Sequence, residues 1–298
     1  MLLLITGSED GTSDLIVKKL KKEVFRFNYD LFSDYSLKLT PTFWEIKSPT
    51  GHSISSDTVT SCFWWKAFNF YILEQERFII EEVKYIFREI YHHCRLRGLV
   101  KGNPHDFHNH LGKLNILAIA SRYFQIPETL ITFQLAGVKE IQASEIVAKS
   151  LTSGLTTTNK ALFTTKVDRE RLHPKFPWFL QELIHSEADI TVFVVGNSLF
   201  GFARSRQSLR GLDWRSEQNF SQLNSEWDLY ELSSEDHGHI LGLMADLGTN
   251  WGRLDFMKNS NGELVFLEFN ANGQWVFLDY DNTHGLLGAV IQYLTSDA

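Results

Sequence analysis

Apolar residues at the start of the chain form short runs that are separated by polar turns. Leu2 to Thr6 is a continuous apolar run and predicts a buried strand. Ser13 and Asp14 are typical of a helix N-cap, and we expect a helix from Leu15 to Val24 behind them. Phe25 to Asn28 is again apolar and predicts a second strand. Strand, helix and strand in this order indicate a small α/β lobe.

The residues up to the break at Gly102-Asn103-Pro104 predict further strands and a helix of the same lobe. Phe43 to Ile46 and His52 to Ile54 predict a hairpin, and Thr60 to Lys66 predicts another strand. Leu73 to Leu96 has the apolar spacing of a long amphipathic helix. Gly102-Asn103-Pro104 interrupts the pattern, and we therefore place the first domain boundary at this break.

The rest of the chain alternates short strands with a few helices. We expect strands at residues 127–132, 145–149, 163–167, 179–184, 190–195 and 198–203, and helices at residues 110–124, 232–247 and 284–294. Between them, Ser150 to Asn159 is rich in Ser, Thr and Gly and is typical of a loop that closes over a site. The expected domains are an N-terminal α/β domain at 1–103, a central lobe at 104–180 and a C-terminal lobe at 181–298.

Composition narrows the class of protein. Of the 298 residues 43% are apolar and 22% are charged, which supports a full core and excludes a disordered chain. The net charge of −7 argues against non-specific nucleic-acid binding, which depends on neutralising phosphates. The cysteines Cys62 and Cys94 cannot build a disulfide framework and favour the cytoplasm. No apolar run approaches the roughly 20 residues of a membrane span, so we expect no membrane association.

Two apolar strands near the end of the chain carry polar side chains where buried strands should have none. A turn at Asn259 to Gly262 joins them and brings together three oxygen-bearing residues, Asp255, Glu268 and Asn270. Arg253 lies two residues before Asp255 and therefore shares its sheet face. Three oxygen ligands beside a guanidinium suit a magnesium nucleotide site. The alternative is a surface hairpin with ordinary outward polar residues, although its neighbours are too apolar for an exposed sheet.

Two lysines are candidates for binding phosphate. Lys149 ends an apolar strand at the start of the Ser/Thr/Gly-rich loop, and Lys113 lies in the first turn of a helix. The chain has no phosphate-binding loop of the P-loop or dinucleotide-binding type, so side chains would have to neutralise the phosphates of a nucleotide. Taken alone, either lysine is better explained by a solvated surface position. The nearby hairpin with its candidate magnesium ligands makes phosphate binding the better explanation for both lysines.

A second segment is a candidate for binding the rest of a nucleotide. An adenine needs a backbone donor and acceptor from an extended segment, and the end of the strand Gln181-Glu182-Leu183-Ile184 supplies one, with Glu182 or Leu183 as candidates. A ribose needs a carboxylate, and Asp189 or Glu187 follows closely. Carboxylates at strand edges are common, so this segment also has an ordinary structural explanation.

Three arginines follow near one strand end. Arg204, Arg206 and Arg215 are able to clamp phosphates or a substrate carboxylate through two-point hydrogen bonds. A solvated loop is an equally good explanation for Arg206. It is a weaker one for Arg215, because the pair Trp214-Arg215 suggests a stacked, ordered guanidinium.

In their order along the chain, these residues resemble the ATP-grasp superfamily of carboxylate–amine ligases. Within it the chain is similar to the microviridin-type ligases, or graspetide synthetases, which close rings in peptides. The residues that carry this resemblance lie over nearly the whole chain: Phe25-Arg26-Phe27-Asn28-Tyr29-Asp30, Trp64-Trp65-Lys66, Gly102-Asn103-Pro104, Lys149 with its loop, Phe163-Thr164-Thr165, Asp213-Trp214-Arg215 and Glu268-Phe269-Asn270-Ala271-Asn272-Gly273-Gln274-Trp275.

The chain departs from these families at a few positions. The microviridin group often has two arginines where this chain has Lys66-Ala67. A related branch, the ribosomal-protein glutamate ligases, usually has arginine where this chain has Thr191. These two differences concern contacts to peptide or phosphate. Ala271 stands where proline is usual and should be neutral for the metal.

The resemblance implies an α/β (α+β) ATP-grasp fold in which the central and C-terminal antiparallel-sheet lobes enclose ATP. It implies that ATP activates Asp or Glu side chains of a ribosomal precursor peptide as acyl phosphates. A Ser or Thr hydroxyl or a Lys amine then closes a macrolactone or macrolactam. In this scheme ATP is bound by Lys113, Lys149, residues 181–184, Asp189 and Arg204. Two Mg²⁺ ions are held by Asp255, Glu268 and Asn270. Arg253 stabilises the oxyanion, and Arg215 binds a substrate carboxylate.

The same resemblance implies a precursor peptide with a leader segment as the partner, and a homodimer. One alternative is another ATP-grasp enzyme that adds an amino acid to a protein or a small molecule, as the ribosomal-protein glutamate ligases do. A second is a non-catalytic nucleotide-binding or scaffolding protein, which would be expected to lack some of the metal ligands.

Overall fold

The computed structural model describes residues 1–68, 77–151, 163–174, 176–207, 209, 211–213 and 227–296. Its N-terminal lobe is built on a parallel sheet with the order β2-β1-β6-β7. The strands are β1 (Leu2–Thr6), β2 (Val24–Asn28), β6 (Ser61–Trp64) and β7 (Val100–Lys101). As predicted, β1 is a buried strand, and every one of its residues is buried.

Helices cover both faces of this sheet, as a parallel sheet requires. Leu2 and Leu4 pack with α1 (Gly11–Leu20) on one face. Leu3 and Ile5 pack with α2 (Arg77–Leu96) on the other. A small antiparallel sheet of β3 (Ser36–Leu39), β4 (Trp44–Lys47) and β5 (Ser53–Ser55) completes the lobe, with short 3₁₀ helices at Lys21–Glu23 and Tyr29–Asp34.

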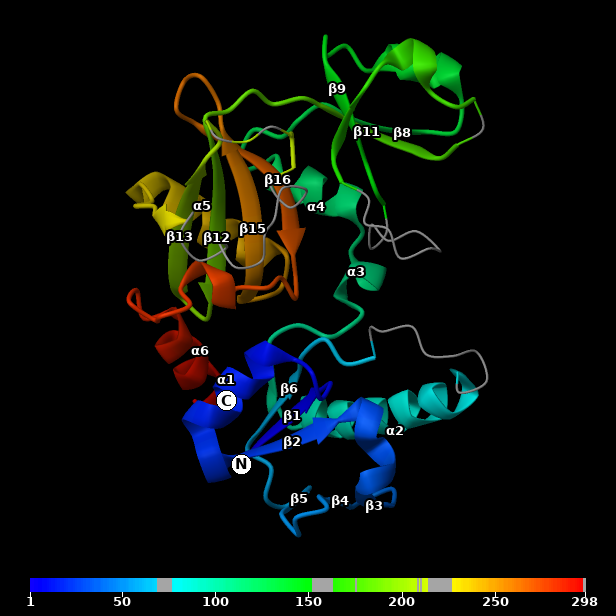
Figure 1. The fold of residues 1–298 in the computed structure, drawn as a ribbon, viewed down its shortest axis with the longest axis vertical. Helices are drawn as coiled ribbons and strands as arrows, with labels where there is room; N and C mark the ends of the chain where they lie inside the picture. Colours follow the sequence, from blue (N-terminus) through cyan, green and yellow to red (C-terminus); the bar gives the residue numbers. More distant parts are fainter. Residues whose placement is uncertain are drawn as a thin grey trace.

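A second, smaller sheet lies at the far end of the molecule from the N-terminal lobe (Figure 1). It is antiparallel, with the order β10-β9-β11-β8 and a small core of its own. Its strands are β8 (Thr129–Thr132), β9 (Ile146–Lys149), β10 (Thr165–Val167) and β11 (Trp178–Glu182), with 3₁₀ helices at Leu135–Glu140 and Arg169–Arg171. The helices α3 (Phe107–His110) and α4 (Lys113–Ala120) precede it.

The third and largest sheet is antiparallel, with the order β14-β13-β12-β15-β16. Its strands are β12 (Ala188–Val195), β13 (Ser198–Ser205), β14 (Asp228–Leu229), β15 (Trp251–Lys258) and β16 (Leu264–Asn270). The helices α4 and α5 (Ser234–Asp246) cover one of its faces. The chain ends with a 3₁₀ helix at Val276–Leu278 and with α6 (Leu286–Thr295).

The C-terminal helix joins the N-terminal lobe to the largest sheet (Figure 1). Leu286, Val290 and Leu294 of α6 share one buried core with Leu2 of β1 and Trp251 of β15. The first and last segments of the chain are therefore packed together, and the N-terminal lobe is held against the end of the β15–β16 hairpin. Among the described residues, none of the helices combines the length and the apolar character that crossing a bilayer requires.

Most predicted elements are confirmed, but several bounds differ, and short elements such as α3, β7 and β14 were not predicted. The helix α1 begins at Gly11, four residues before the predicted start, because the side chain of Asp10 accepts the Ser13 N–H at 2.7 Å and forms the cap. The strand β3 was not predicted, since all of its residues are exposed and give no buried face. The predicted helix at 110–124 is shorter in the structure, at Lys113–Ala120. The domain boundaries stay a prediction, and β11 spans the one at 180/181.

Candidate functional site

The predicted hairpin near the end of the chain is formed by β15 and β16. In its register Arg253 faces Asn270, and Asp255 faces Glu268. A bulge follows directly after Asp255 and changes the register for the rest of the hairpin. The four side chains predicted to meet at this hairpin thus come from two nearby pairs of facing residues in one strand pair.

Hydrogen bonds join these side chains into one cluster. Arg253 donates from Nε to Asp255 Oδ1 at 3.1 Å and from Nη2 to Oδ2 at 3.0 Å. Asn270 Nδ2 lies 2.7 Å from Asp255 Oδ2 and 3.2 Å from Glu268 Oε1. The hydroxyl of Thr191, on the neighbouring strand β12, donates to Asp255 Oδ1 at 2.7 Å. The hairpin therefore brings Asp255, Glu268 and Asn270 together, as the sequence predicted.

The chemistry of this cluster fits magnesium. Two carboxylates and one amide offer the hard oxygen ligands that Mg²⁺ prefers. Within the described residues no group of three His, Cys, Asp or Glu side chains is suited to a metal ion, so the third protein ligand at this place would be the amide oxygen of Asn270. The amide of Asn270 presents its nitrogen to Asp255 and Glu268, and metal binding would use its Oδ1 instead.

A pocket of about 610 Å³ lies between the smaller antiparallel sheet and this hairpin. Lys113 of α4, Lys149 of β9, and Glu268 and Asn270 of β16 line it together. Lys113 Nζ donates to the backbone oxygen of Ser150 at 2.9 Å. Both lysines predicted to bind phosphate therefore share one pocket with two of the predicted metal ligands. The opposing charges suit a magnesium-bound polyphosphate.

The segment predicted to bind adenine borders this pocket through Gln181. Gln181 is almost completely buried, and its amide donates to the Thr129 hydroxyl at 3.0 Å. The N–H groups of Glu182 and Leu183 are engaged by the oxygens of Glu128 and Glu145, at 2.8 and 2.9 Å. By contrast, the N–H of Ile184 has no hydrogen-bond acceptor among the described residues. Of these backbone donors, that of Ile184 is the one left for a ligand.

Asp189 is a buried carboxylate beside the metal cluster. Arg206 Nη1 donates to its Oδ1 at 2.6 Å, whereas its Oδ2 is buried with no partner in the described part of the chain. Burial raises the pKa of Asp189, and Arg206 opposes that shift. Asp189 lines a second, smaller pocket together with Lys149, Arg253 and Asp255. The unpaired oxygen is what a ribose hydroxyl would require.

The remaining candidates are placed only in part. Arg204 is buried on β13, opposite Asp189 of β12. Arg215 lies outside the described residues, as does most of the predicted closing loop at 150–159. Their roles stay predictions.

Sequence reasoning missed one residue that holds the site together. The amide of Asn103 donates to the backbone oxygens of Trp251 and Ala271, at 2.7 and 2.8 Å, and so ties the start of β15 to the residue that follows β16. Thr249 completes this arrangement by donating to Asn103 Oδ1 at 2.6 Å. The only signal in the sequence was the break at Gly102-Asn103-Pro104, which we interpreted as a domain boundary.

Comparison with known proteins identifies the fold as that of the ATP-grasp ligases. No protein-family model matches the chain, and no curated protein is similar to it in sequence. Among solved structures, the chain is similar to the Chryseobacterium gregarium RiPP-associated ATP-grasp ligase in complex with ADP and a leader and core peptide. That match has a TM-score of 0.82 and 20% identity, and covers 98% of this chain and 96% of the other. The expected ATP-grasp fold is thereby confirmed.

Two further solved structures are similar to this chain. The macrocyclase MdnC of Microcystis aeruginosa MRC, bound with precursor peptide MdnA, matches with a TM-score of 0.77 and 22% identity over 99% of both chains. The ATP-grasp ligase PsnB, complexed with a phosphomimetic variant of a minimal precursor, Mg and ADP, matches with a TM-score of 0.75 and 13% identity over 99% of this chain and 98% of the other.

Proposed function

We propose that the protein is an ATP-dependent ligase that closes rings in a ribosomal precursor peptide. The observation that carries this proposal is the pocket that Lys113 and Lys149 share with Glu268 and Asn270, within a fold shared over nearly its whole length with ligases that were solved bound to precursor peptides. Lysines and oxygen ligands in one pocket suit the triphosphate of ATP with its magnesium.

ATP would lie in this pocket and in the smaller pocket that shares Lys149 and Glu268 with it, with its base toward the end of β11. There the free N–H of Ile184 is the candidate donor to adenine among the residues that the structure describes. The unpaired Oδ2 of Asp189 is the candidate acceptor for a ribose hydroxyl. We assign the phosphates to Lys113 and Lys149, and we place Arg204 near the nucleotide as well.

Asp255, Glu268 and Asn270 would hold magnesium, for which we propose two ions. When bound, the metal offsets the charge of the phosphates and orients them for transfer. A carboxylate oxygen of the substrate attacks the γ-phosphorus of ATP, the bond to the bridging oxygen breaks, and ADP leaves with that electron pair. Arg253, which is held by Asp255, would stabilise the charge that develops on the transferred group.

The resulting acyl phosphate has a good leaving group. A hydroxyl or amine of the same peptide attacks the acyl carbon, phosphate leaves, and one proton is released, so that an ester or amide closes the ring. We assign Arg215 to a substrate carboxylate, and we propose that the loop at 150–159 closes over the phosphates and excludes water.

The proposal extends to the partners and the setting of the protein. We propose a precursor peptide with a leader segment as substrate, a homodimer as the assembly, and the cytoplasm as the compartment. The free, buried thiols of Cys62 and Cys94 support a reducing environment.

Release of ADP in the presence of candidate precursors tests the proposed activity. The candidates are short peptides encoded next to the gene of this protein. We expect the true precursor to stimulate ADP release, and a version with its core Asp and Glu replaced by Asn and Gln to lose that stimulation. Stimulation by a free amino acid instead would favour the alternative ligase that adds an amino acid to a protein or small molecule.

A further inference from the structure

The short helix α3 contributes side chains to two different pockets. His108 and Asn109 line the proposed nucleotide pocket, whereas Phe107 and His110 line a second pocket of about 690 Å³. This second pocket is also lined by α2, by most of the chain between Val100 and Leu111, by the turn at 247–250 and by Tyr293 of α6. It shares none of its described lining residues with either pocket that contains Lys149. Its volume is that of a site for a small ligand.

Basic side chains dominate this second pocket, which we call the basic pocket. They come from α2 and from the segment that begins in β7: Arg88, His92, Arg95, Lys101, His105 and His110. Of the described residues that line the pocket, Asp106 is the only acid. Three lysine and arginine cations against one carboxylate leave a formal charge of +2 with the histidines neutral. The whole chain, by contrast, has a net charge of −7, so the positive charge is concentrated at this place.

The two arginines of the basic pocket have no acceptor of their own. Within the described part of the chain, neither Arg88 nor Arg95 makes a hydrogen bond or an ion pair. The carboxylate of Asp106 is directed to histidines instead, and its oxygens lie 4.0 Å from His105 Nδ1 and 3.5 Å from His110 Nε2. The pocket therefore holds two guanidinium groups whose donors are available to a ligand.

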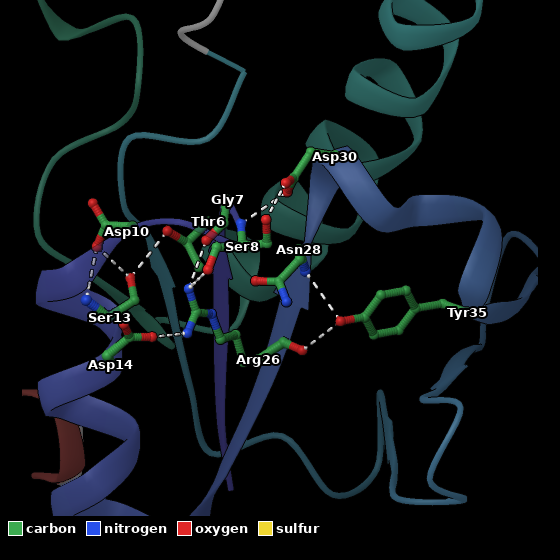
Figure 2. A network of polar contacts seen from close by, with 10 residues as sticks. All are labelled: Thr6, Gly7, Ser8, Asp10, Ser13, Asp14, Arg26, Asn28, Asp30 and Tyr35. Atoms are coloured by element: carbon green, nitrogen blue, oxygen red, sulfur yellow. Dashed lines mark hydrogen bonds and ion pairs between the residues drawn. The ribbon is translucent and has the colours of Figure 1, made fainter.

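An arginine elsewhere in the same lobe has a different environment. Figure 2 shows Arg26 of β2, which pairs with Asp14 and donates from Nη2 to the backbone oxygens of Gly7 and Ser8, at 2.6 and 3.1 Å. The guanidinium of Arg26 thus fixes the loop after β1 and serves the fold. Neither arginine of the basic pocket has such a structural task, and each keeps five N–H groups for a ligand.

The cations of α2 also lie close to one another. Arg88, His92 and Arg95 follow at spacings of four and three residues, which places them on one face of the helix, where like charges repel. Their charges act on His105 as well. Burial lowers the pKa of His105, Asp106 opposes this shift, and Arg88 and His92 are among the cations that add to it. An anion in the basic pocket would relieve this repulsion.

The arrangement of the arginines indicates the chemistry of the ligand. The planar fork of a guanidinium matches two oxygens of a phosphate or a carboxylate. Arg88 and Arg95 are seven residues apart, or about 10 Å along the helix axis. Together they suit an anion with charge on more than one group, rather than a single small ion.

We propose that the basic pocket binds a small multivalent oxyanion, with Arg88 and Arg95 as its main donors. Phosphate compounds and polycarboxylates share this chemistry. The inference goes beyond the proposed function and does not depend on it, because the basic pocket is separate from the residues assigned to ATP and magnesium.

Isothermal titration calorimetry without Mg²⁺ tests this assignment, with inorganic pyrophosphate and citrate as probes. Arg88→Met and Arg95→Met keep the length of the side chain and remove its charge. Arg77→Met is the matched control, because Arg77 is an exposed arginine of α2 that does not line the basic pocket. We expect the wild type to bind at least one probe, and the Kd to rise about tenfold or more in Arg88→Met and in Arg95→Met. Arg77→Met should match the wild type.

A further variant separates the basic pocket from the proposed nucleotide pocket, which pyrophosphate also suits. Lys149→Met removes a cation from the latter only. We expect the binding that Arg88→Met weakens to persist in Lys149→Met. Thermal melts without either probe check that every variant is folded.

Each outcome supports or overturns the inference. Tighter binding of pyrophosphate would assign the basic pocket to phosphate compounds, and tighter binding of citrate would assign it to polycarboxylates. Failure of both probes to bind at millimolar concentrations would overturn the inference, as would equal affinities in the wild type, Arg88→Met and Arg95→Met. Loss of binding in Lys149→Met would overturn it as well, by moving the probe to the nucleotide pocket. None of these results bears on ring closure, which is measured separately with the precursor.

Discussion

Arg253 and Asp255 meet in a two-point contact, Nε to Oδ1 at 3.1 Å and Nη2 to Oδ2 at 3.0 Å, on one face of β15. Their spacing of two residues places both on the same face, and the bulge after Asp255 ends that regular stretch. Asp255 thus has two tasks in the proposed site. It orients the guanidinium, and it offers oxygens to the metal.

This geometry predicts that Arg253 cannot be replaced by another cation. Arg253→Lys keeps the charge but loses the planar fork, so we expect kcat for ring closure to fall by about 10²-fold or more. Arg122→Lys changes an exposed arginine that pairs with Asp246 and should leave kcat unchanged. Wild-type kcat in the Arg253→Lys variant would show that the two-point contact has no part in the chemistry.

The magnesium assignment predicts a changed metal requirement. Glu268→Gln removes one charged ligand, and we expect the Mg²⁺ concentration for half-maximal activity to rise about tenfold or more. The exposed Glu140→Gln serves as the matched control. Chelation of Mg²⁺ should abolish activity in every case. If titrations of Glu268→Gln and wild type coincide, Glu268 does not bind the metal.

Asn103 is predicted to stabilise the folded state through the hydrogen bonds that it donates beside the site. Asn103→Ala removes the donor to the buried backbone oxygens of Trp251 and Ala271, of which that of Trp251 keeps the Thr249 hydroxyl at 3.3 Å. We expect the free energy of unfolding to fall by about 1–3 kcal/mol, the cost of one unsatisfied group. Chemical denaturation measures this loss, and the exposed Asn109→Ala should be nearly neutral. A change below about 0.5 kcal/mol would mean that the hairpin ends do not depend on Asn103.

Two glycines of α5 provide a matched pair for the packing of that helix. An added Cβ at Gly238 meets nothing within 4 Å, whereas at Gly242 it would lie 2.6 Å from the ring of Tyr123. Gly238→Ala should therefore raise the free energy of unfolding by about 0.5–1 kcal/mol, through helix propensity. Gly242→Ala should lower it, because α5 and the Tyr123 ring would have to separate. Equal effects of the two substitutions in denaturant melts would contradict this packing.

The sequence was most informative where side chains alternate regularly. Alternation predicted that Arg253 and Asp255 share one face, the hairpin turn predicted that Asp255, Glu268 and Asn270 meet, and the register of the hairpin brings all four together. The apolar run of β1 likewise predicted a buried strand with the correct bounds. In the hairpin a local period of two determines the direction of each side chain, and in β1 the unbroken apolar run marks a strand that is covered on both faces.

The sequence was least informative where segments that are distant along the chain come into contact. The roles of Asn103 and Thr191 depend on partners 148 and 64 residues away in the chain. No local pattern reports such contacts. The start of α1 was misplaced for a smaller reason: Asp10, Ser13 and Asp14 are all good capping residues, and only the fold selects Asp10.

The intact mass of a candidate precursor, measured after incubation with the protein, ATP and Mg²⁺, tests the proposed ring closure. Each ester or amide that forms within the peptide expels one water, so we expect the mass to fall by one water for every ring, with one ADP formed each time. The loss should vanish without ATP. An unchanged mass would contradict ring closure, as would a mass that increases by an added amino acid.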